Sequence, residues 1–288
     1  MKLRRFCISL VSLTLVFFLS VFIFFPLPGY IPVLMYHFIY PKEEVSVKDS
    51  LNVSIDAFER QMWFLKTFGY RVISMDEYYE IKMGSRKPRG KEILITFDDG
   101  HRTYIKNALP ILKRYQLKST EFLIWRYLSS SEWKDYINLN EAKELSGDPL
   151  ITFESHTMTH PNLTQIPSSR AKSEIFQSKE YLQKALKKEM NYFSYPEGSF
   201  SPEIMQFVQK AGYRMAFRTS FKKYKTFPQI PYAVVRIKVS PKYNLFVFWL
   251  EVSGLAYYAK HMGYFFDQLT PGFHNDKLKA YTNHHGAA

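Results

Sequence analysis

A single cysteine, Cys7, occurs in the 288 residues of the sequence. The fold therefore cannot depend on an internal disulfide, and beyond residue 7 cysteine is excluded both as a nucleophile and as a metal ligand. Any chemistry must come from His, Asp, Glu, Ser, Tyr, Lys or Arg. Hydrophobic residues make up 46% of the chain, which is enough to build a large core and excludes an intrinsically disordered protein.

Internal repeats and low-complexity stretches are also absent, and no nucleic-acid-binding motif occurs. The formal net charge of +13 favours acidic surroundings, such as an anionic membrane face or a polyanionic envelope polymer, although a soluble protein with a basic surface is the alternative. Without a motif to accompany the charge, we expect no nucleic-acid partner. The linker-like segments are short, so residues 30–288 are expected to form one continuous domain.

Residues 6–25 contain no charged side chain and follow the basic sequence MKLRR. A helix of this length spans a bilayer, and the basic stub predicts that everything after Pro26 lies on the far side of the membrane. A cleaved signal peptide is the alternative, but its apolar core is usually shorter and ends at small residues, whereas this run ends in FFPLPGY. We therefore predict a short cytoplasmic stub and a transmembrane anchor within residues 1–29.

Strand-like and helix-like segments alternate along the rest of the chain. Ser54 is expected to cap a helix that Gly69 closes, and a second helix is expected from Ser201 to Gly212. A long basic helix is expected over residues 168–189. Strands that alternate with helices indicate a parallel sheet, and their number predicts closure into a barrel. The predicted strands are residues 31–36, 70–75, 92–97, 119–124, 149–154, 191–195, 213–218 and 233–239.

Several of these strands are followed at once by polar side chains of catalytic types. In barrels of parallel strands, catalytic groups gather at the carboxyl ends of the strands. We therefore expect these side chains to lie close together. They are His37, Asp98, Asp99, His156, His160 and Glu197, the last preceded by Pro196.

The two histidines of SHTMTH at 155–160 suggest a metal site. His156 and His160 would face one side of a helical turn, and neutral imidazoles bind Zn, Fe, Ni and Co. One carboxylate from the adjacent pair Asp98 and Asp99 would complete a set of two histidines and one acid, while its neighbour faces the open coordination position. Taken separately, the histidines could be surface or core residues, and the acids could open an Asp-Gly turn.

Three motifs in this order resemble those of the NodB-type polysaccharide deacetylases, carbohydrate esterase family four. They are TFDDG at 96–100, SHTMTH at 155–160 and SYPEG at 194–198. The resemblance implies an α/β fold, a distorted (β/α) barrel of seven or eight units known as the NodB homology fold. It also implies a hydrolase that acts on amide bonds, a polysaccharide N-deacetylase that releases acetate.

Two further segments narrow the resemblance. PVLMYH at 32–37 and VVRIKV at 234–239 are similar to the branch that deacetylates the poly-β-1,6-N-acetylglucosamine of biofilm matrices, the intercellular-adhesin deacetylases. The similarity extends over roughly residues 30–240, with a motif-bearing core at 91–240. The partners it implies are an N-acetylglucosamine polysaccharide, the bacterial cell membrane through a single N-terminal helix, and a polymer synthase or export machinery. The domain would be extracytoplasmic, or secreted if the N-terminal segment is cleaved.

The resemblance also implies a metal and its ligands. Asp99, His156 and His160 match the residues that hold a divalent metal in this family. The metal is most often Zn²⁺, with Co²⁺, Ni²⁺ and Fe²⁺ as alternatives.

Four further roles follow from the same resemblance. Asp98 matches the general base, His37 matches the general acid of this branch, and Arg236 matches the arginine that orients the base. The backbone N–H of Glu197 matches a donor to the oxyanion. Family members more often carry an aromatic residue at position 197, which puts substrate fit in doubt more than catalysis, because only the backbone is needed.

Aromatic side chains near strand ends are weaker candidates for sugar binding. Tyr195 with Pro196 is expected to contact substrate, and Tyr36 and Trp125 could stack on sugars or belong to the core. The apolar segment 246–266 is expected to form a C-terminal closing helix, with a position on the membrane surface as the alternative.

Three other functions compete with a β-1,6 deacetylase. A deacetylase of peptidoglycan or chitin-type β-1,4 chains differs only in the polymer linkage. A non-haem iron oxygenase also uses two histidines and a carboxylate, but its usual H-x-D/E pattern is missing here. A non-catalytic polysaccharide-binding protein on the same fold would need neither Asp98 nor His37.

Overall fold

The computed structural model describes residues 29–46, 48–219, 230–257 and 259. The predicted anchor at 6–25 lies outside these residues and stays a prediction. Of the predicted closing helix at 246–266, the structure describes residues 246–257 and 259, which include most of α9 (Leu245–Val252), and the rest stays a prediction. Within the described ranges, no helix has the length and apolarity needed to cross a bilayer.

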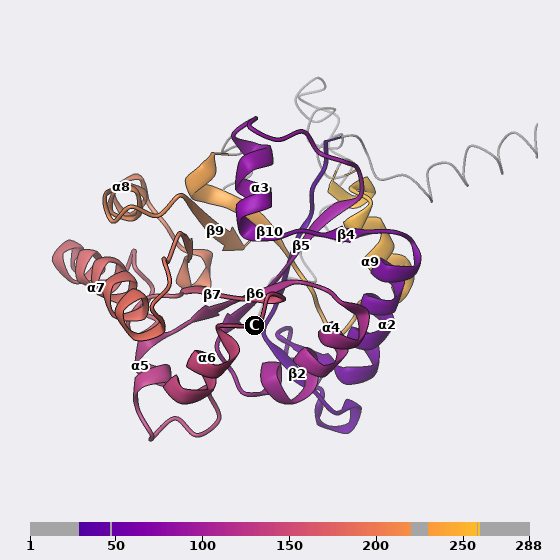
Figure 1. Cartoon of the computed structure of the whole chain (residues 1–288), viewed down its shortest axis with the longest axis horizontal. Coiled ribbons are helices and arrows are strands. Elements are labelled where there is room, and N and C mark those ends of the chain that lie inside the picture. Colours follow the sequence, from indigo (N-terminus) through magenta and orange to yellow (C-terminus); the bar gives the residue numbers. More distant parts are fainter. Residues whose placement is uncertain (1–28, 47, 220–229, 258, 260–288) are drawn as a thin grey trace, which may run out of the picture.

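Seven parallel strands form a closed ring (Figure 1). Pairing of β1 with β5, from Val33 beside Leu94 to Tyr36 beside Phe97, closes the ring, and a short strand β4 (Arg71–Val72) pairs with the start of β5. The predicted barrel of parallel strands is therefore confirmed. In ring order the strands are β1 (Val33–Tyr36), β10 (Val234–Lys238), β9 (Met215–Thr219), β8 (Tyr192–Ser194), β7 (Ile151–Ser155), β6 (Ser119–Leu123) and β5 (Glu92–Asp99).

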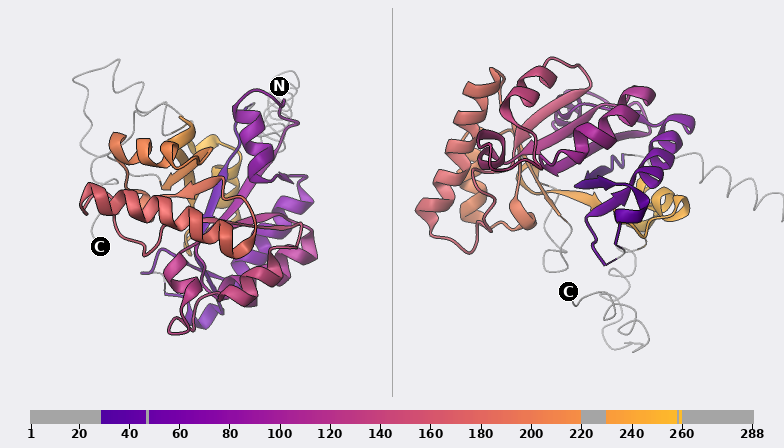
Figure 2. Two further views of the ribbon diagram at one scale, coloured as in Figure 1. Left: turned by 60° about the vertical axis from the view of Figure 1, so that its left-hand side comes forward. Right: turned by 90° about the horizontal axis from the view of Figure 1, so that it is seen from below.

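Helices surround the strands, as Figure 2 shows from two further sides. A second, two-stranded parallel sheet of β2 (Phe38–Tyr40) and β3 (Asn52–Ser54) follows β1. The helices are α2 (Ile55–Thr67), α3 (Met75–Lys82), α4 (Leu109–Tyr115), α5 (Trp125–Ser129), α6 (Leu139–Leu145), α7 (Ser168–Leu186), α8 (Pro202–Lys210) and α9 (Leu245–Val252). Short helical turns are η1 (Lys42–Glu44), η2 (Tyr104–Ala108), η3 (Pro196–Gly198) and η5 (Pro231–Ala233).

The predicted helix caps are confirmed. The Ser54 hydroxyl accepts a hydrogen bond from the Ala57 N–H at the start of α2, and the Ser201 hydroxyl does the same at the start of α8. Gly69 follows α2 with a φ of +71°, in the left-handed region that glycine enters without strain.

The predicted strand at 70–75 is wrong beyond Val72. Ser74 instead caps α3, because its hydroxyl accepts the Glu77 N–H while the Glu77 carboxylate accepts the Ser74 N–H. This reciprocal capping box ends the extended segment before Met75. Of the predicted strand, Arg71 and Val72 form β4, and only Met75 belongs to the helix.

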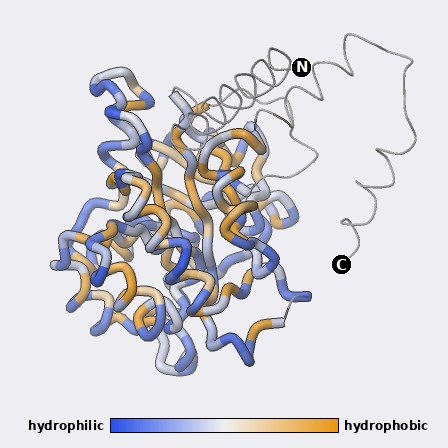
Figure 3. The backbone as a smooth tube through the Cα atoms, turned by 90° about the vertical axis from the view of Figure 1, so that its right-hand side faces the viewer, coloured by the Kyte–Doolittle hydropathy of each residue, from blue (hydrophilic) through white to orange (hydrophobic). Residues whose placement is uncertain are grey.

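Helix α3 closes one end of the ring. Its Met75 and Tyr78 are buried against Leu94, Phe122 and Phe217, which belong to the core inside the barrel. Figure 3 shows mainly hydrophobic strands in the centre and hydrophilic loops around them.

This closed end is the end at which the strands begin. The side-chain O–H of Tyr192, the first residue of β8, donates a 2.6 Å hydrogen bond to Asp76 of α3. The opposite end, where the strands finish, is left for a site.

Candidate active site

The side chains expected to act together lie at the carboxyl ends of the strands. Asp98 and Asp99 are the last two residues of β5, His37 directly follows β1, and His156 directly follows β7. Arg236 differs, because it lies within β10 and is fully buried. Four strands of the ring thus contribute polar side chains to one region.

The turn that begins at Asp99 gives the two aspartates different surroundings. Asp99 has a φ of +78° and Gly100 a φ of +73°, both in the left-handed region. A side chain at Gly100 would also meet Leu123, since an added Cβ would lie 2.9 Å from its Cδ2. Glycine is therefore required for this turn, which leaves Asp98 buried and Asp99 partly exposed.

Asp99, His156 and His160 form a cluster that could hold a metal ion, with one ligand atom from each residue within 4.8 Å of the others. Asp99 Oδ1 lies 3.5 Å from His156 Nε2 and 3.4 Å from His160 Nε2. The two Nε2 atoms are 3.2 Å apart. The donor set, two imidazoles and one carboxylate, suits zinc and similar divalent ions.

The expectation that the two histidines share a helical turn is wrong. Residues 156–160 form a loop in which Thr157 and His160 have φ values of +73° and +61°. The Thr157 hydroxyl accepts a 3.0 Å hydrogen bond from the His160 N–H and steadies the loop. The imidazoles are brought together by left-handed backbone conformations and not, as expected, by the spacing of a helix.

The protonation of this cluster also fits a metal site. His156 Nδ1 donates to the Ser194 carbonyl at 2.8 Å, so Nε2 presents its lone pair to Asp99 and His160. Burial lowers the pKa of His156 to about 3, which keeps it in the neutral form that binds metals. Burial and the Asp98 carboxylate raise the pKa of Asp99 to about 7, and a cation would favour its charged form.

Asp98 is held by a buried arginine. Arg236 Nη1 donates to Asp98 Oδ1 at 2.7 Å and Nη2 donates to Oδ2 at 2.5 Å. Nη2 also donates to the Ser194 hydroxyl at 2.8 Å. Burial alone would raise the pKa of Asp98, but Arg236 and His156 outweigh it and hold this pKa well below its usual range. Asp98 is therefore a carboxylate at neutral pH.

His37 is half-buried at the end of β1. Burial lowers the pKa of His37 to about 4, and the opposing effect of the Asp98 carboxylate is too small to compensate. The imidazole is therefore neutral near pH 7.

Glu197 lies in the turn η3, directly after β8. Its φ of +55° is in the left-handed region, and its exposed side chain accepts a 2.7 Å hydrogen bond from Asn162 Nδ2. The role of its backbone N–H as a donor to the oxyanion stays a prediction.

The expected sugar-stacking side chains are mostly core residues. Tyr36 and Tyr195 expose 0% and 1% of their surface, and the Tyr195 O–H donates to the Tyr232 carbonyl at 2.9 Å. Pro196 is buried as well. Packing covers both side chains in this structure, and the prediction that Tyr195 and Pro196 contact substrate stays a prediction. Half-buried Trp125 contacts the Tyr181 ring.

Three other aromatic side chains lie near the site and were not expected from the sequence. Tyr127, Trp133 and Tyr136 follow β6 at the same end of the barrel. Their position after the predicted strand 119–124 could reveal them, because the acids and histidines were located by the same criterion, a position at the carboxyl end of a strand.

The barrel and its cluster of two histidines and two aspartates define an α/β-barrel hydrolase, and comparisons with known proteins give its family. The polysaccharide deacetylase family matches residues 85–216. The Bacillus subtilis (strain 168) protein YxkH is named as a polysaccharide deacetylase. It is 31% identical to this chain over 214 residues, which cover 74% of this chain and 73% of YxkH. The chain belongs to the polysaccharide deacetylase family, whose members hydrolyse amide bonds.

Two further relatives are informative. The poly-β-1,6-N-acetyl-D-glucosamine N-deacetylase of Staphylococcus aureus (strain MRSA252) is 29% identical over 176 residues, which cover 58% of this chain and 60% of that enzyme. The Streptococcus pyogenes deacetylase PplD, solved in complex with acetate, superposes with a TM-score of 0.68 and 26% identity, covering 79% of this chain and 99% of PplD.

Proposed function

We propose that this polysaccharide deacetylase removes N-acetyl groups from an N-acetylglucosamine polymer by metal-dependent hydrolysis, and that the polymer is β-1,6-linked. The observation that carries the proposal is the different surroundings of two neighbouring acids. Asp98 is paired with buried Arg236, whereas Asp99 lies against His156 and His160. One acid is thereby suited to proton transfer and the other to metal binding. The similarity to the S. aureus enzyme supports the β-1,6 linkage.

Asp99, His156 and His160 would hold the metal, with zinc as the proposed ion. When bound, a divalent ion supplies a Lewis acid that polarises the amide carbonyl and lowers the pKa of a water molecule. The chain's part is to keep both histidines neutral and oriented, which burial and the bond from His156 to Ser194 achieve. Co²⁺, Ni²⁺ and Fe²⁺ suit the same donors.

Asp98 is the general base in this proposal. It accepts a proton from the water that attacks the acetyl carbonyl, and Arg236 keeps it ionised and fixes both carboxylate oxygens. The Glu197 N–H donates to the carbonyl oxygen as negative charge develops on it. Since only the backbone of Glu197 takes part, its side chain can face solvent.

His37 is the general acid that protonates the departing nitrogen. Because the pKa of His37 is lowered to about 4, the imidazole is neutral before the reaction and must gain the proton that it donates. Asp98, which has taken a proton from water, is a sufficient source. The proton balance then closes, because one proton passes from water through Asp98 and His37 to the amine.

We also propose a location for the enzyme. The domain at 30–288 lies outside the bacterial cell membrane, is anchored by residues 6–25, and works on polymer that a synthase or export machinery delivers. The apolar run of the sequence and its basic flank support this arrangement.

Acetate release from defined pentamers tests the proposal. We expect faster release from a β-1,6-linked N-acetylglucosamine pentamer than from the β-1,4-linked one, loss of activity with a chelator, and recovery with added zinc. Faster release from the β-1,4 pentamer would assign the protein to peptidoglycan or chitin-type polymers. Binding of either pentamer without any acetate release would indicate a non-catalytic polysaccharide-binding protein.

A further inference from the structure

Three aromatic rings form a contiguous cluster that has no part in the proposed reaction. The ring centroid of Tyr127 lies 4.2 Å from that of Tyr136 and 4.3 Å from that of Trp133. Trp133 and Tyr136 are 5.9 Å apart. All three side chains are half-buried, so each leaves part of its surface to solvent. We call Tyr127, Trp133 and Tyr136 the aromatic wall.

The wall is tied to the turn that carries Asp99. The Ile137 N–H donates to the Gly100 carbonyl at 2.8 Å, and the Arg102 N–H donates to the Asp135 carbonyl at 2.8 Å. His101 and Tyr136 form an antiparallel bridge between these two bonds. The loop that ends the wall is thereby held directly beside the metal-ligand turn.

The start of the same segment is tied to the histidine loop. The Arg126 N–H donates to the Met158 carbonyl at 2.8 Å, and the Trp125 N–H donates to the Thr157 carbonyl at 3.2 Å. Both acceptors lie between the two histidines. The wall is therefore fixed to both segments that supply metal ligands, and its distance from the reacting centre is set by the backbone.

The charge of Asp99 raises the pKa of two tyrosines of the wall. Burial and then Asp99 raise the pKa of Tyr127. Burial, Tyr127 and then Asp99 raise the pKa of Tyr136 to about 12. Both phenols are thus uncharged and close to the metal-ligand carboxylate.

One hydrogen-bond donor of the wall is left unpaired. Trp133 Nε1 is shielded from solvent and has no hydrogen-bond partner among the described residues. A donor left in this state costs free energy unless a ligand supplies an acceptor. The guanidinium of Arg126 lies 5.6 Å from the centre of the Trp133 ring and adds a second donor group nearby.

These properties match one face of a hexopyranose. A β-linked pyranose in the chair form has an apolar C–H face that packs on aromatic rings, and hydroxyl groups that accept hydrogen bonds at the edge of that face. We propose that the aromatic wall is a sugar-binding subsite, which holds the pyranose next to the one whose acetamide is hydrolysed. This inference rests on the proposed function, since it needs a polymer substrate.

The aromatic surface continues beyond the wall. His101 contacts the Tyr136 ring at 5.4 Å and the Phe38 ring at 4.8 Å between centroids. The half-buried rings therefore reach from the loop after β6, across the loop after β5, to the segment after β1. A surface of this extent suits a chain of several sugars better than a single residue.

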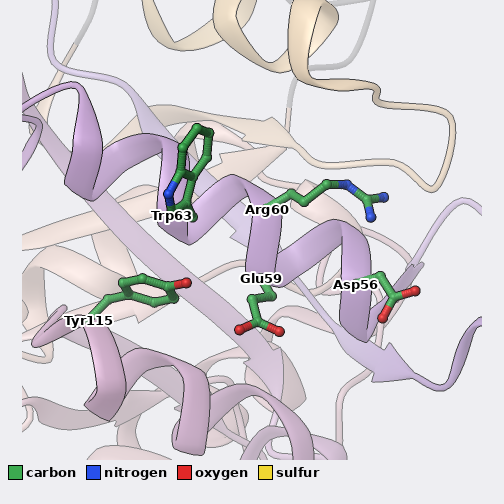
Figure 4. Close-up of a pocket in the computed structure, with 5 residues that line it drawn as sticks. All are labelled: Asp56, Glu59, Arg60, Trp63 and Tyr115. Carbon is green, nitrogen blue, oxygen red and sulfur yellow. The ribbon is translucent and has the colours of Figure 1, made fainter.

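An exposed tryptophan elsewhere provides a matched control. Trp63 is 45% exposed on α2, where it lines a shallow pocket with Glu59 and Tyr115 (Figure 4). This pocket lies on the outer helices α2 and α4, and none of its lining residues belongs to the wall or to the cluster of Asp99, His156 and His160. A variant of Trp63 removes an exposed aromatic side chain without touching the wall.

The test compares variants in binding and in turnover. Tyr127→Ala removes the central ring, and Tyr127→Leu keeps the apolar bulk but not the flat face, so that loss of folding can be separated from loss of binding. Both are made in the metal-loaded, full-length protein, with Trp63→Ala as control. Affinity for the β-1,6-linked N-acetylglucosamine pentamer is measured by calorimetry in a slowly hydrolysing His37→Gln background. KM and kcat for the dimer and the pentamer are measured without that background.

We expect both Tyr127 variants to weaken pentamer binding by roughly tenfold, with the pentamer KM rising by a similar factor and kcat changing by less than about threefold. Trp63→Ala should match the parent protein. Pentamer affinity within about twofold of the parent in both Tyr127 variants, or an equal loss in Trp63→Ala, would overturn the subsite. If the parent protein released no acetate but its pentamer binding still depended on Tyr127, the subsite would stand and the proposed reaction would fail.

Discussion

The two ends of the barrel use the same kinds of charged side chain for different purposes. Where the strands finish, Asp98 and Arg236 form a buried pair beside the three side chains that could hold a metal ion. Where they begin, Glu77 of α3 binds Arg71, Arg86 and Lys118 at 2.8–3.0 Å. The first group faces a donor set for a metal, whereas the second joins α3 to the starts of strands.

Charge balance distinguishes the two ends. The Glu77 carboxylate has three cationic partners and accepts the Ser74 N–H, so its pKa is lowered to about 2 although burial opposes this. At the other end, no Lys or Arg side chain of the described residues forms an ion pair with Asp99, and burial with Asp98 raises its pKa to about 7 although Arg236 opposes this. A carboxylate with cationic partners, such as Glu77, stabilises the fold. A carboxylate without them beside two histidines, such as Asp99, is a candidate functional group.

The largest effect should follow from Asp98→Asn. Loss of the general base is expected to lower kcat/KM for acetate release by about 10²–10⁴-fold. Asp76→Asn makes the same substitution on α3 at the opposite end and should leave activity unchanged, as steady-state kinetics would show. Activity of Asp98→Asn within tenfold of wild type would remove Asp98 from the mechanism.

Arg236→Lys should have the next largest effect. A lysine keeps the charge but cannot bond both carboxylate oxygens, so we expect kcat to fall by roughly 10–100-fold and the free energy of unfolding to fall by about 1–3 kcal/mol. Kinetics and urea unfolding measure the two effects. If Arg236→Lys kept full activity, a single positive charge would be sufficient and the bidentate hydrogen bonding of Arg236 would not be needed.

Glu77→Gln should change stability alone. Because the folded pKa of Glu77, about 2, lies below its ordinary value of 4.5, its contribution is present above about pH 4.5 and is lost as the pH falls towards 2. Glu77 is partly exposed, so we expect a loss of only about 1–2 kcal/mol at pH 7, which shrinks over that interval. Urea unfolding at several pH values measures it; a large drop in kcat would contradict the separation of the two ends.

The smallest effect is expected from Glu197→Gly. Glycine keeps the N–H and accepts the φ of +55° without strain, so kcat should stay within about threefold and stability should rise by up to about 1 kcal/mol. Glu203→Gly, within α8, is the control for a change that should destabilise the protein. A tenfold loss of kcat in Glu197→Gly would show that the side chain takes part.

Parts of this structure follow from sequence pattern and others do not. Apolar runs with polar ends predict the seven ring strands and the positions of Asp98, His156 and His37, because a buried parallel strand leaves little choice of side chain. The pair β2 and β3 has no such pattern: each strand has three residues, with one buried.

Backbone conformation and packing account for the remaining differences. The spacing of His156 and His160 fits a helix, but Thr157 and His160 adopt positive φ values that spacing does not reveal. Tyr195 stands at a strand end as a sugar-binding residue would, yet it is covered by neighbours. Tyr127 and Trp133 contact each other across a loop whose course depends on bonds to two other loops. These features depend on tertiary contacts.

Metal content distinguishes the proposed roles of Asp98 and Asp99. Wild type, Asp98→Asn and Asp99→Asn would be loaded with zinc, dialysed together and measured for bound metal by mass spectrometry. We expect about one zinc per chain in wild type and in Asp98→Asn, and a large loss in Asp99→Asn, since of the two aspartates only Asp99 lies against both histidines. Equal zinc content in the two variants would contradict the division of roles between these neighbours.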